Sequence, residues 1–243
     1  MSYVLILGAK SDIAKAVARE YAKHGYDLYL AARNSKDLTS FANDINVRTQ
    51  RTIKLLELDI LDYSNHQGFY ENITEKPLGV ISAIGYLGEQ EVAENNFSEA
   101  KKIIDTNYTA VVSLLNIIAN DFESRRNGFI VGISSVAGDR GRKSNYYYGS
   151  AKAAFTAYLS GMRNRLYDAQ VNVLTVKPGF VSTKMTENMD LPEKLTAKPE
   201  TVASDIYHAQ QKGKSVIYTM WIWRWIMLII RNIPEFQFKK MSI

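Results

Sequence analysis

The chain has no cysteine, only three histidines and no run of basic residues. Disulfide bonds and thiolate catalysis are therefore excluded, and nothing indicates an oxidising compartment. His24, His66 and His208 lack the spacing of metal ligands, so we expect no metal site. Without a basic run, the net charge of +5 predicts no nucleic-acid partner. A charge of this size is ordinary for a slightly basic soluble protein, and it would also favour binding of a phosphorylated ligand or of an anionic membrane surface.

A signal peptide is also missing from the pattern of the N-terminus. After Met1 and Ser2 the chain enters the strand-like YVLILG directly, without a charged leader or a small-residue cleavage site. We therefore expect a cytoplasmic protein. Its 243 residues, 46% hydrophobic and 23% charged, suit one large α/β domain, and no internal repeat or low-complexity linker divides it.

What the chain does contain is a series of short, largely apolar runs separated by helical patterns. The runs cover residues 3–7, 26–31, 55–58, 80–85, 129–133, 171–176 and 215–219. Such runs are typical of strands buried on both faces of a parallel sheet. Helical patterns follow at residues 13–24 and, over a longer stretch, at 95–126. The alternation predicts a Rossmann-type, doubly wound sheet of about seven parallel strands in a single α/β domain.

The stretch ISSVAGDRGRKSNYYYGSAK, from Ile133 to Lys152, carries the most informative chemistry. Of its three tyrosines only Tyr148 has a lysine four residues later, which places both side chains on one helix face. A nearby ammonium favours the phenolate and is expected to lower the tyrosine pKa from about 10. Ser135 follows the apolar run 129–133. Together these groups can polarise a carbonyl and protonate its oxygen, whereas a lone Tyr-x-x-x-Lys would be an ordinary helix face.

Ser135, Tyr148 and Lys152, with Asn107 in the segment IIDTNYTA, resemble the catalytic set of the short-chain dehydrogenase/reductase family. The resemblance covers residues 1–220 and implies hydride transfer between a nicotinamide cofactor and a carbonyl. It implies that Tyr148 is the general acid and that Ser135 hydrogen-bonds the same oxygen. Lys152 would lower the tyrosine pKa and hold the ribose. Asn107 would shape a helix kink and hold a water on the proton path.

The first strand and helix are joined by a glycine turn, the context in which helix N-terminal amides attract a pyrophosphate. The family loop reads Thr-Gly, three residues, then Gly-Ile-Gly. Here Gly8 and Ile13 match, whereas Leu7, Asp12 and Ala14 replace the other positions, and Ser11 or Asp12 would cap the helix. An acidic side chain at a pyrophosphate is unfavourable unless it turns to the backbone. The resemblance nevertheless places the cofactor on Gly8, Lys10, Ser11, Asp12 and Ile13.

The second run ends in Ala32-Arg33-Asn34 and lacks the acidic residue that would hold the ribose hydroxyls of NAD. Arg33, with Lys10, suits a 2′-phosphate, so we predict NADP(H); the alternative for Arg33 is a solvated surface charge. The family resemblance adds further cofactor contacts, partly with the catalytic residues themselves. These are Asp59, Ile60, Gly85, Tyr148, Lys152, Pro178, Gly179, Val181 and Thr183.

The chain ends differently from the commonest family members. Residues 185–199 read as a short polar lid over the substrate, and residues 221–243 form an aromatic and basic extension that holds all three tryptophans. Its apolar run of 221–230 is too short to span a bilayer, which needs about 20 residues. Such a helix suits a membrane interface, with the protein at the inner face of the membrane, or burial against the fold or in an oligomer contact.

The sequence leaves three possible functions of the protein open. The tail resembles that of the decaprenylphosphoryl-2-keto-ribose reductase subgroup, which implies a polyprenyl-phosphate-linked keto-sugar as substrate. A 3-oxoacyl thioester reductase is the second enzymatic reading. A non-catalytic NADP(H)-binding sensor or scaffold is the third, because the glycine loop is altered. Family habit also leads us to expect a homodimer through the helices that contain Asn107 and Tyr148.

Overall fold

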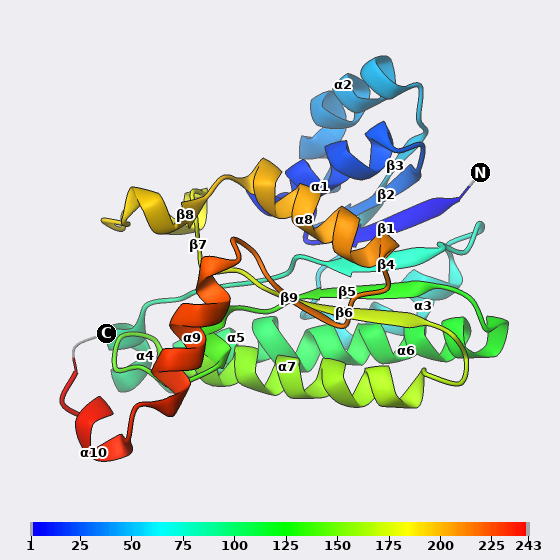
Figure 1. The fold of residues 1–243 in the computed structure, drawn as a ribbon. Coiled ribbons are helices and arrows are strands. Elements are labelled where there is room, and N and C mark those ends of the chain that lie inside the picture. The colour runs from blue at the N-terminus through cyan, green and yellow to red at the C-terminus, as the bar shows by residue number, and fades with distance from the viewer. Residues whose placement is uncertain (1, 242–243) are drawn as a thin grey trace.

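The computed structural model describes residues 2–241 and shows a twisted parallel sheet between two layers of helices (Figure 1). The strand order is β3-β2-β1-β4-β5-β6-β9, and every neighbouring pair is parallel. The prediction of a single Rossmann-type α/β domain with seven parallel strands is confirmed. The strands are β1 (Tyr3–Leu7), β2 (Asp27–Ala32), β3 (Ile53–Glu57), β4 (Gly79–Ser82), β5 (Phe129–Ile133), β6 (Asn172–Lys177) and β9 (Val216–Tyr218).

Both faces of the sheet are covered, which explains why the strands are apolar throughout. Residues of β1, β2, β4 and β5 are all buried. Helices α1 (Asp12–Lys23), α2 (Thr39–Thr49) and α8 (Pro199–Gln211) cover one face; α3 (His66–Glu71), α6 (Ala110–Arg125) and α7 (Tyr146–Arg165) cover the other (Figure 1). The direction of winding reverses between β1 and β4, and crevices at such points bind ligands in doubly wound folds.

The predicted helix over residues 95–126 exists as a nearly continuous helical stretch with a defect in its middle. Asn96 is extended and its side chain accepts a hydrogen bond from Ser98 N at 3.0 Å, so α5 (Phe97–Ile104) begins there. Helix α4 (Gln90–Asn95) precedes it as a separate turn. Between α5 and α6, residues 105–109 form a π-helical turn that contains Asn107. Such turns are frequent at functional sites, because they re-aim a side chain.

The C-terminal part builds one end of the molecule beside the carboxyl edge of the sheet (Figure 1). Strands β7 (Phe180–Val181) and β8 (Thr196–Ala197) pair with each other, and most of the predicted lid lies between them. After β9 come α9 (Ile222–Asn232) and α10 (Glu235–Phe238). Trp223 and Met227 of α9 are buried against Val136.

No helix within residues 2–241 has the length and apolarity to cross a membrane. The division into residues 1–220 and an extension of 221–243 stays a prediction.

Candidate active site

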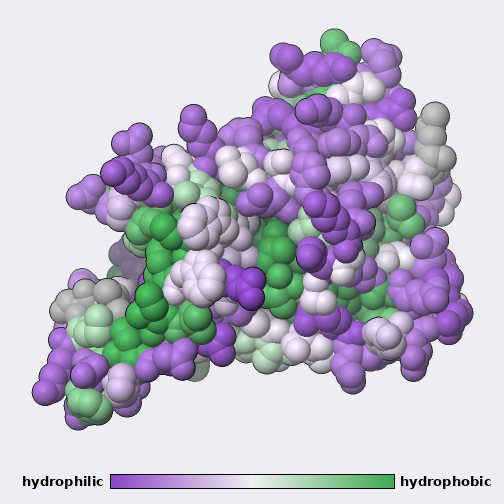
Figure 2. Space-filling view, in the orientation of Figure 1, coloured by the Kyte–Doolittle hydropathy of each residue, from purple (hydrophilic) through white to green (hydrophobic). Residues whose placement is uncertain are grey.

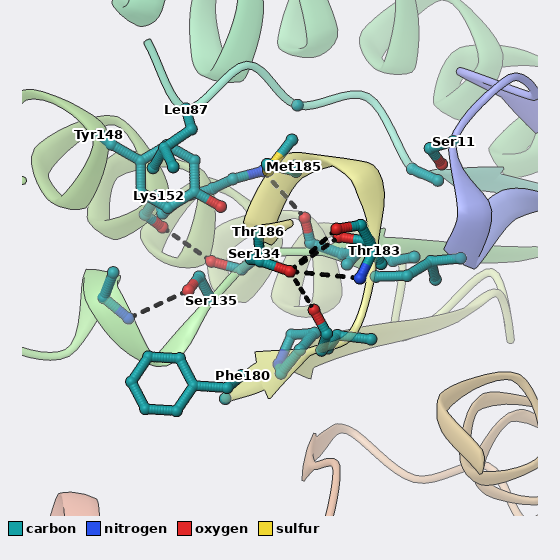
Figure 3. A pocket seen from close by; sticks show the side chains of 18 of the residues that line it. Ser11, Leu87, Ser134, Ser135, Tyr148, Lys152, Phe180, Thr183, Met185 and Thr186 are labelled. Atoms are coloured by element: carbon teal, nitrogen blue, oxygen red, sulfur yellow. Dashed lines mark hydrogen bonds between the residues drawn. The ribbon is translucent and has the colours of Figure 1, made fainter. Parts of the chain in front are cut away.

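The carboxyl ends of the central strands open onto a cavity of about 330 Å³. Most of the residues that the sequence assigned to catalysis or cofactor binding line it (Figure 3). They are Lys10, Ser11, Asp12, Ile13, Gly85, Ser135, Tyr148, Lys152, Pro178, Gly179, Val181 and Thr183. Five others are not part of its lining: Gly8, Arg33, Asp59, Ile60 and Asn107. Distant segments of the chain therefore meet where the switch point of the sheet lies.

The two serines after β5 have different tasks. Ser134 is buried, and its Oγ donates to the main-chain oxygen of Lys152 at 2.9 Å, which ties α7 to the end of β5. Ser135 caps the short 3₁₀ turn that follows, and its Oγ accepts a hydrogen bond from Ala137 N at 3.1 Å. Its hydroxyl proton remains available for another acceptor. Ser135 is thus the serine suited to a carbonyl in the cavity.

Tyr148 and Lys152 project from the first turns of α7 into the same end of the cavity (Figure 3). Lys152 Nζ lies 5.6 Å from the Tyr148 ring centroid and donates to the main-chain oxygens of Ile133, at 3.1 Å, and Ile84, at 3.4 Å. Burial lowers the pKa of Lys152 to about 8. Burial also raises the pKa of Tyr148 to about 12, against the lowering effect of a hydrogen bond with Ser135.

The expectation that Lys152 lowers the pKa of Tyr148 is therefore wrong for this structure. The ammonium is directed at two main-chain oxygens, and loss of hydration is the larger effect on the phenol. The phenol therefore keeps its proton at neutral pH, as a tyrosine with the ordinary pKa of about 10 also does. That protonated form is the one a general acid needs.

Asn107 supports the site from behind. It is fully buried, and its Nδ2 donates to the main-chain oxygens of Tyr86 and Ile103 at 2.6 and 2.9 Å. Its Oδ1 accepts from Tyr86 N at 3.2 Å. A Cβ atom placed on the neighbouring Gly85 would lie 3.5 Å from Asn107 Oδ1 and 3.7 Å from Lys152 Nζ. Asn107 thus holds the turn after β4 beside the lysine, and Gly85 leaves open the space between them.

The backbone of the glycine loop has the form expected of a dinucleotide-binding turn, whereas the side chain of Asp12 departs from the family pattern. Gly8 has a φ of +76°, and a Cβ there would lie only 3.0 Å from main-chain atoms of Ala83 and Ile84. Ser11 caps α1, since its Oγ accepts from Ala14 N at 3.2 Å. Asp12 Oδ2 accepts from Lys184 N at 2.8 Å, so the carboxylate is turned to the backbone of the segment after β7.

Arg33 follows β2, where the family resemblance leads us to expect the adenosine of the cofactor. It is exposed and makes no hydrogen bond or ion pair with another residue of 2–241. Lys10, its expected companion, pairs with Asp37 at 2.6 Å. The Glu57 carboxylate accepts hydrogen bonds from Asn34 N at 2.6 Å and from Ser35 N at 2.8 Å. Sequence reasoning missed both carboxylates, because Glu57 is the last residue of β3 and Asp37 lies in the turn after β2, and no motif distinguishes either.

The adenine residues expected from the resemblance lie near one another at the end of β3. The Asp59 side chain accepts from Leu61 N at 3.0 Å and is exposed, whereas Ile60 is buried. Their contact with adenine stays a prediction. Within residues 2–241 no cluster of histidine and carboxylate side chains could hold a metal ion.

Three residues of the site carried no signal that sequence reasoning used. Arg142 and Asn145, in the loop between Ser135 and α7, line the cavity. Trp223 of α9 packs on the Pro178-Gly179 turn so closely that a Cβ on Gly179 would lie 1.9 Å from its indole. The indole Nε1 also donates to Leu195 O at 3.1 Å. The tail therefore supports a turn of the cavity wall.

A family model described as short chain dehydrogenase matches residues 2–194. An oxidoreductase of Mycobacterium tuberculosis, itself uncharacterised, is 35% identical over 241 residues, which cover 98% of this chain and 96% of that protein. A short-chain dehydrogenase from Sphingobium yanoikuyae, solved with NADPH, superposes with a TM-score of 0.83 at 21% identity and covers 97% of both chains. A 3-oxoacyl-[acyl-carrier protein] reductase from Brucella melitensis gives 0.79 at 20% identity, covering 90% of this chain and 91% of that one. The chain therefore belongs to the short-chain dehydrogenase family of nicotinamide-dependent oxidoreductases.

Proposed function

We propose that this protein reduces a ketone to a secondary alcohol with NADPH. The observation that carries the proposal is the meeting of Ser135, Tyr148 and Lys152 in one cavity with the residues expected to hold the cofactor. A tyrosine phenol is protonated at neutral pH, so Tyr148 can donate a proton to a carbonyl oxygen, as ketone reduction requires. A sensor that binds NADP(H) without turnover has no need of such a set.

When bound, the reduced nicotinamide supplies the hydride. Tyr148 Oη donates a proton to the carbonyl oxygen as negative charge develops there, and Ser135 Oγ donates a hydrogen bond to that same oxygen. Lys152 places a positive charge beside the phenol and would donate a hydrogen bond to the cofactor ribose. Asn107 fixes the turn at Gly85 and so keeps the lysine and the proton path in position. The apolar wall excludes water from the reacting groups.

A pH profile tests the role of Lys152 directly. Its charged form is the competent one and its pKa is lowered to about 8, so kcat/KM for NADPH should be level below that pH and fall above it. This parameter reports groups of the free enzyme. In Lys152→Arg the charge persists to high pH, so the residual activity should lose this fall. An unchanged fall in that variant would assign it to another group.

We propose that Arg33 binds the 2′-phosphate and gives preference for NADPH. Arg33→Ala should weaken NADPH binding about 10- to 100-fold, as expected for a charge-assisted hydrogen bond of ~1.5–3 kcal/mol, and leave NADH binding nearly unchanged. Fluorescence titration with each cofactor measures the difference. Arg48→Ala is the matched control, because Arg48 is an exposed arginine of α2 paired with Asp44. Equal losses for NADPH and NADH would contradict the assignment.

For the substrate we propose a ketone delivered from a lipid surface, such as a polyprenyl-phosphate-linked keto-sugar. The exposed face of α9 supports this, since Trp221, Ile229 and Trp225 are 75, 67 and 54% exposed. Figure 2 shows hydrophobic residues gathered at the end of the molecule where α9 lies. The buried face of the same helix packs on the cavity wall through Trp223. Basic residues accompany it at Arg224, Arg231, Lys239 and Lys240.

A 3-oxoacyl thioester is the second candidate substrate. Its support is the likeness in fold to the Brucella melitensis reductase, a 3-oxoacyl-[acyl-carrier protein] reductase. The two candidates differ in their need for a membrane. If the substrate is a thioester on a carrier protein, the exposed tryptophans of α9 have no role. If it is a lipid-linked ketone, they bind the membrane that holds the substrate.

Membrane contact is tested best by substitution, because truncation would remove the buried Trp223 and Met227. The protein should float with anionic liposomes, and a variant combining Trp221→Ser, Trp225→Ser and Ile229→Ser should not, with its thermal unfolding unchanged. Tyr167→Ser is the control, since Tyr167 is 78% exposed beyond the C-terminal end of α7. Failure of the unaltered protein to float would contradict membrane contact.

The same variant separates the competing role of α9. If the apolar face is a subunit contact, its substitution should lower the mass in sedimentation. Dimer formation through the helices containing Asn107 and Tyr148 stays a prediction, and so does a location at the inner face of a membrane.

A further inference from the structure

Arg142 places in the cavity wall a guanidinium that the described chain does not satisfy. The residue is half-buried, and its Nε is shielded from solvent without a hydrogen-bond partner in residues 2–241. Within residues 2–241 its one contact of hydrogen-bond type joins Nη2 to Met227 Sδ at 3.5 Å, and a thioether is a weak acceptor. The group has five donors and almost nothing to donate to.

Other shielded arginines of this fold are used differently. Arg140, two residues earlier, donates to the main-chain oxygens of Ile230 and Ile233 at 2.7 and 2.6 Å and pairs with Glu235 at 2.8 Å. Arg163 donates to Val173 O at 2.9 Å and has further oxygen partners. Each of these two arginines thus donates to several oxygen acceptors. A shielded donor without one costs free energy, which a ligand can recover.

The positive charge of Arg142 is compensated only in part, by Asp139 beyond ion-pair distance. The acid closest to it in sequence is Asp139, whose carboxylate is held by Lys177 Nζ in a buried ion pair and by the Tyr218 hydroxyl at 2.7 Å. Arg142 forms no ion pair with any residue of 2–241. Because Lys177 already neutralises Asp139, the guanidinium brings a net positive charge to the cavity.

A second unsatisfied group lies in the same loop. Asn145 Oδ1 is shielded from solvent and lacks a hydrogen-bond partner among the described residues. As an amide oxygen it can accept from a hydroxyl. The cavity is also lined by the apolar side chains of Leu87, Val136, Phe180, Met185 and Met189. Arg142 and Asn145 therefore offer a cation and an acceptor to a ligand in the cavity, which these apolar side chains also line.

We propose that Arg142 binds an anionic group of the ketone substrate, a phosphate or a carboxylate, and that Asn145 accepts a hydrogen bond from a neighbouring hydroxyl. This assignment rests on the proposed ketone reduction and names its substrate class. The cofactor phosphates are expected elsewhere, at the N-terminus of α1, where Ser11 lies well away from Tyr148 and Ser135 (Figure 3). A guanidinium matches either anion because its donors form a planar fork.

Binding can be measured without turnover. Inorganic phosphate, and separately acetate, is titrated calorimetrically into the full chain saturated with NADPH, so that the cofactor's own phosphate sites are filled. We expect saturable binding of one or both anions, weakened roughly tenfold or more in Arg142→Met. Lys143→Met is the matched control, because Lys143 is exposed and lies outside the cavity lining. Absence of binding, or equal binding by Arg142→Met, would overturn the assignment.

Kinetics separate this inference from the proposed function. For a keto acid and its methyl ester, or a keto phosphate and its neutral ester, the unaltered protein should favour the anion in kcat/KM by roughly tenfold or more. That ratio should fall towards one in Arg142→Met and persist in Lys143→Met. Equal reduction of both members by the unaltered protein would overturn the anion site and leave ketone reduction standing. Reduction of neither, with phosphate bound through Arg142, would contradict ketone reduction and leave the anion site standing.

Discussion

Replacement of Tyr148 by phenylalanine should lower kcat/KM for ketone reduction by about 10²- to 10⁴-fold, the usual contribution of a general acid. The variant removes a single oxygen and keeps the ring that packs beside Lys152. NADPH binding should therefore change by no more than about threefold, because the loss falls on an interaction made in the transition state. Steady-state NADPH oxidation and a fluorescence titration measure the two quantities.

Tyr147→Phe is the matched control for this experiment. Tyr147 is the preceding residue of α7 and packs in a small cluster with Ala93, Ala100 and Ile103, outside the cavity lining. Its variant should keep normal turnover. Near-normal turnover of Tyr148→Phe would remove the proposed proton donor. Tight NADPH binding without turnover of any ketone by the unaltered protein would favour the sensor.

Replacement of Lys152 by methionine should impair both turnover and cofactor binding. Its ammonium is buried between the ends of β4 and β5, where it donates to Ile84 O and Ile133 O beside the Gly85 turn. Without that charge the phenol loses its positive neighbour, and the proposed contact of Lys152 with the cofactor ribose is lost. We expect turnover to fall by at least about 100-fold and NADPH affinity by roughly tenfold. This joint loss distinguishes Lys152 from Tyr148.

Lys177→Met controls for the removal of a buried ammonium. Lys177 pairs with the nearly buried Asp139, so its loss leaves an uncompensated carboxylate and should cost about 3–5 kcal/mol of the free energy of unfolding. Lys152 has no carboxylate partner among the described residues, so Lys152→Met should be less destabilising. A stability loss as large as that of Lys177→Met, with normal turnover per folded molecule, would make Lys152 structural.

The end of a strand could be predicted where its pairing with the neighbouring strand and its apolar run stop at the same residue. Both limits coincide in β1 and β5, whose bounds match the apolar runs. They diverge in β4, because Ala83 and Ile84 continue the apolar pattern but the partner strand does not. Leu7, the last residue of β1, pairs with Ser82, and Gly8 then turns away. A strand end set by its partner cannot be predicted from the strand's own residues.

The site was predictable where a motif is local. Tyr148 and Lys152 share a helix face, and Ser11 caps the helix that it precedes. Contacts across the chain were not predictable, such as Asp12 with the Lys184 amide. The prediction that the pKa of Tyr148 is lowered was wrong for the same reason, because burial by distant segments decides the direction of the shift. Arg142 became notable only through the acceptors it lacks.

The most direct test of ketone reduction follows the hydride itself. NADPH deuterated at its hydride-donating carbon is mixed with the purified protein and an anionic ketone, and the product is examined by mass spectrometry. The predicted result is one deuterium on the new carbinol carbon, formed by the unaltered protein and not by Tyr148→Phe. Product without deuterium, or the same yield of labelled alcohol from Tyr148→Phe, would contradict the proposed reaction.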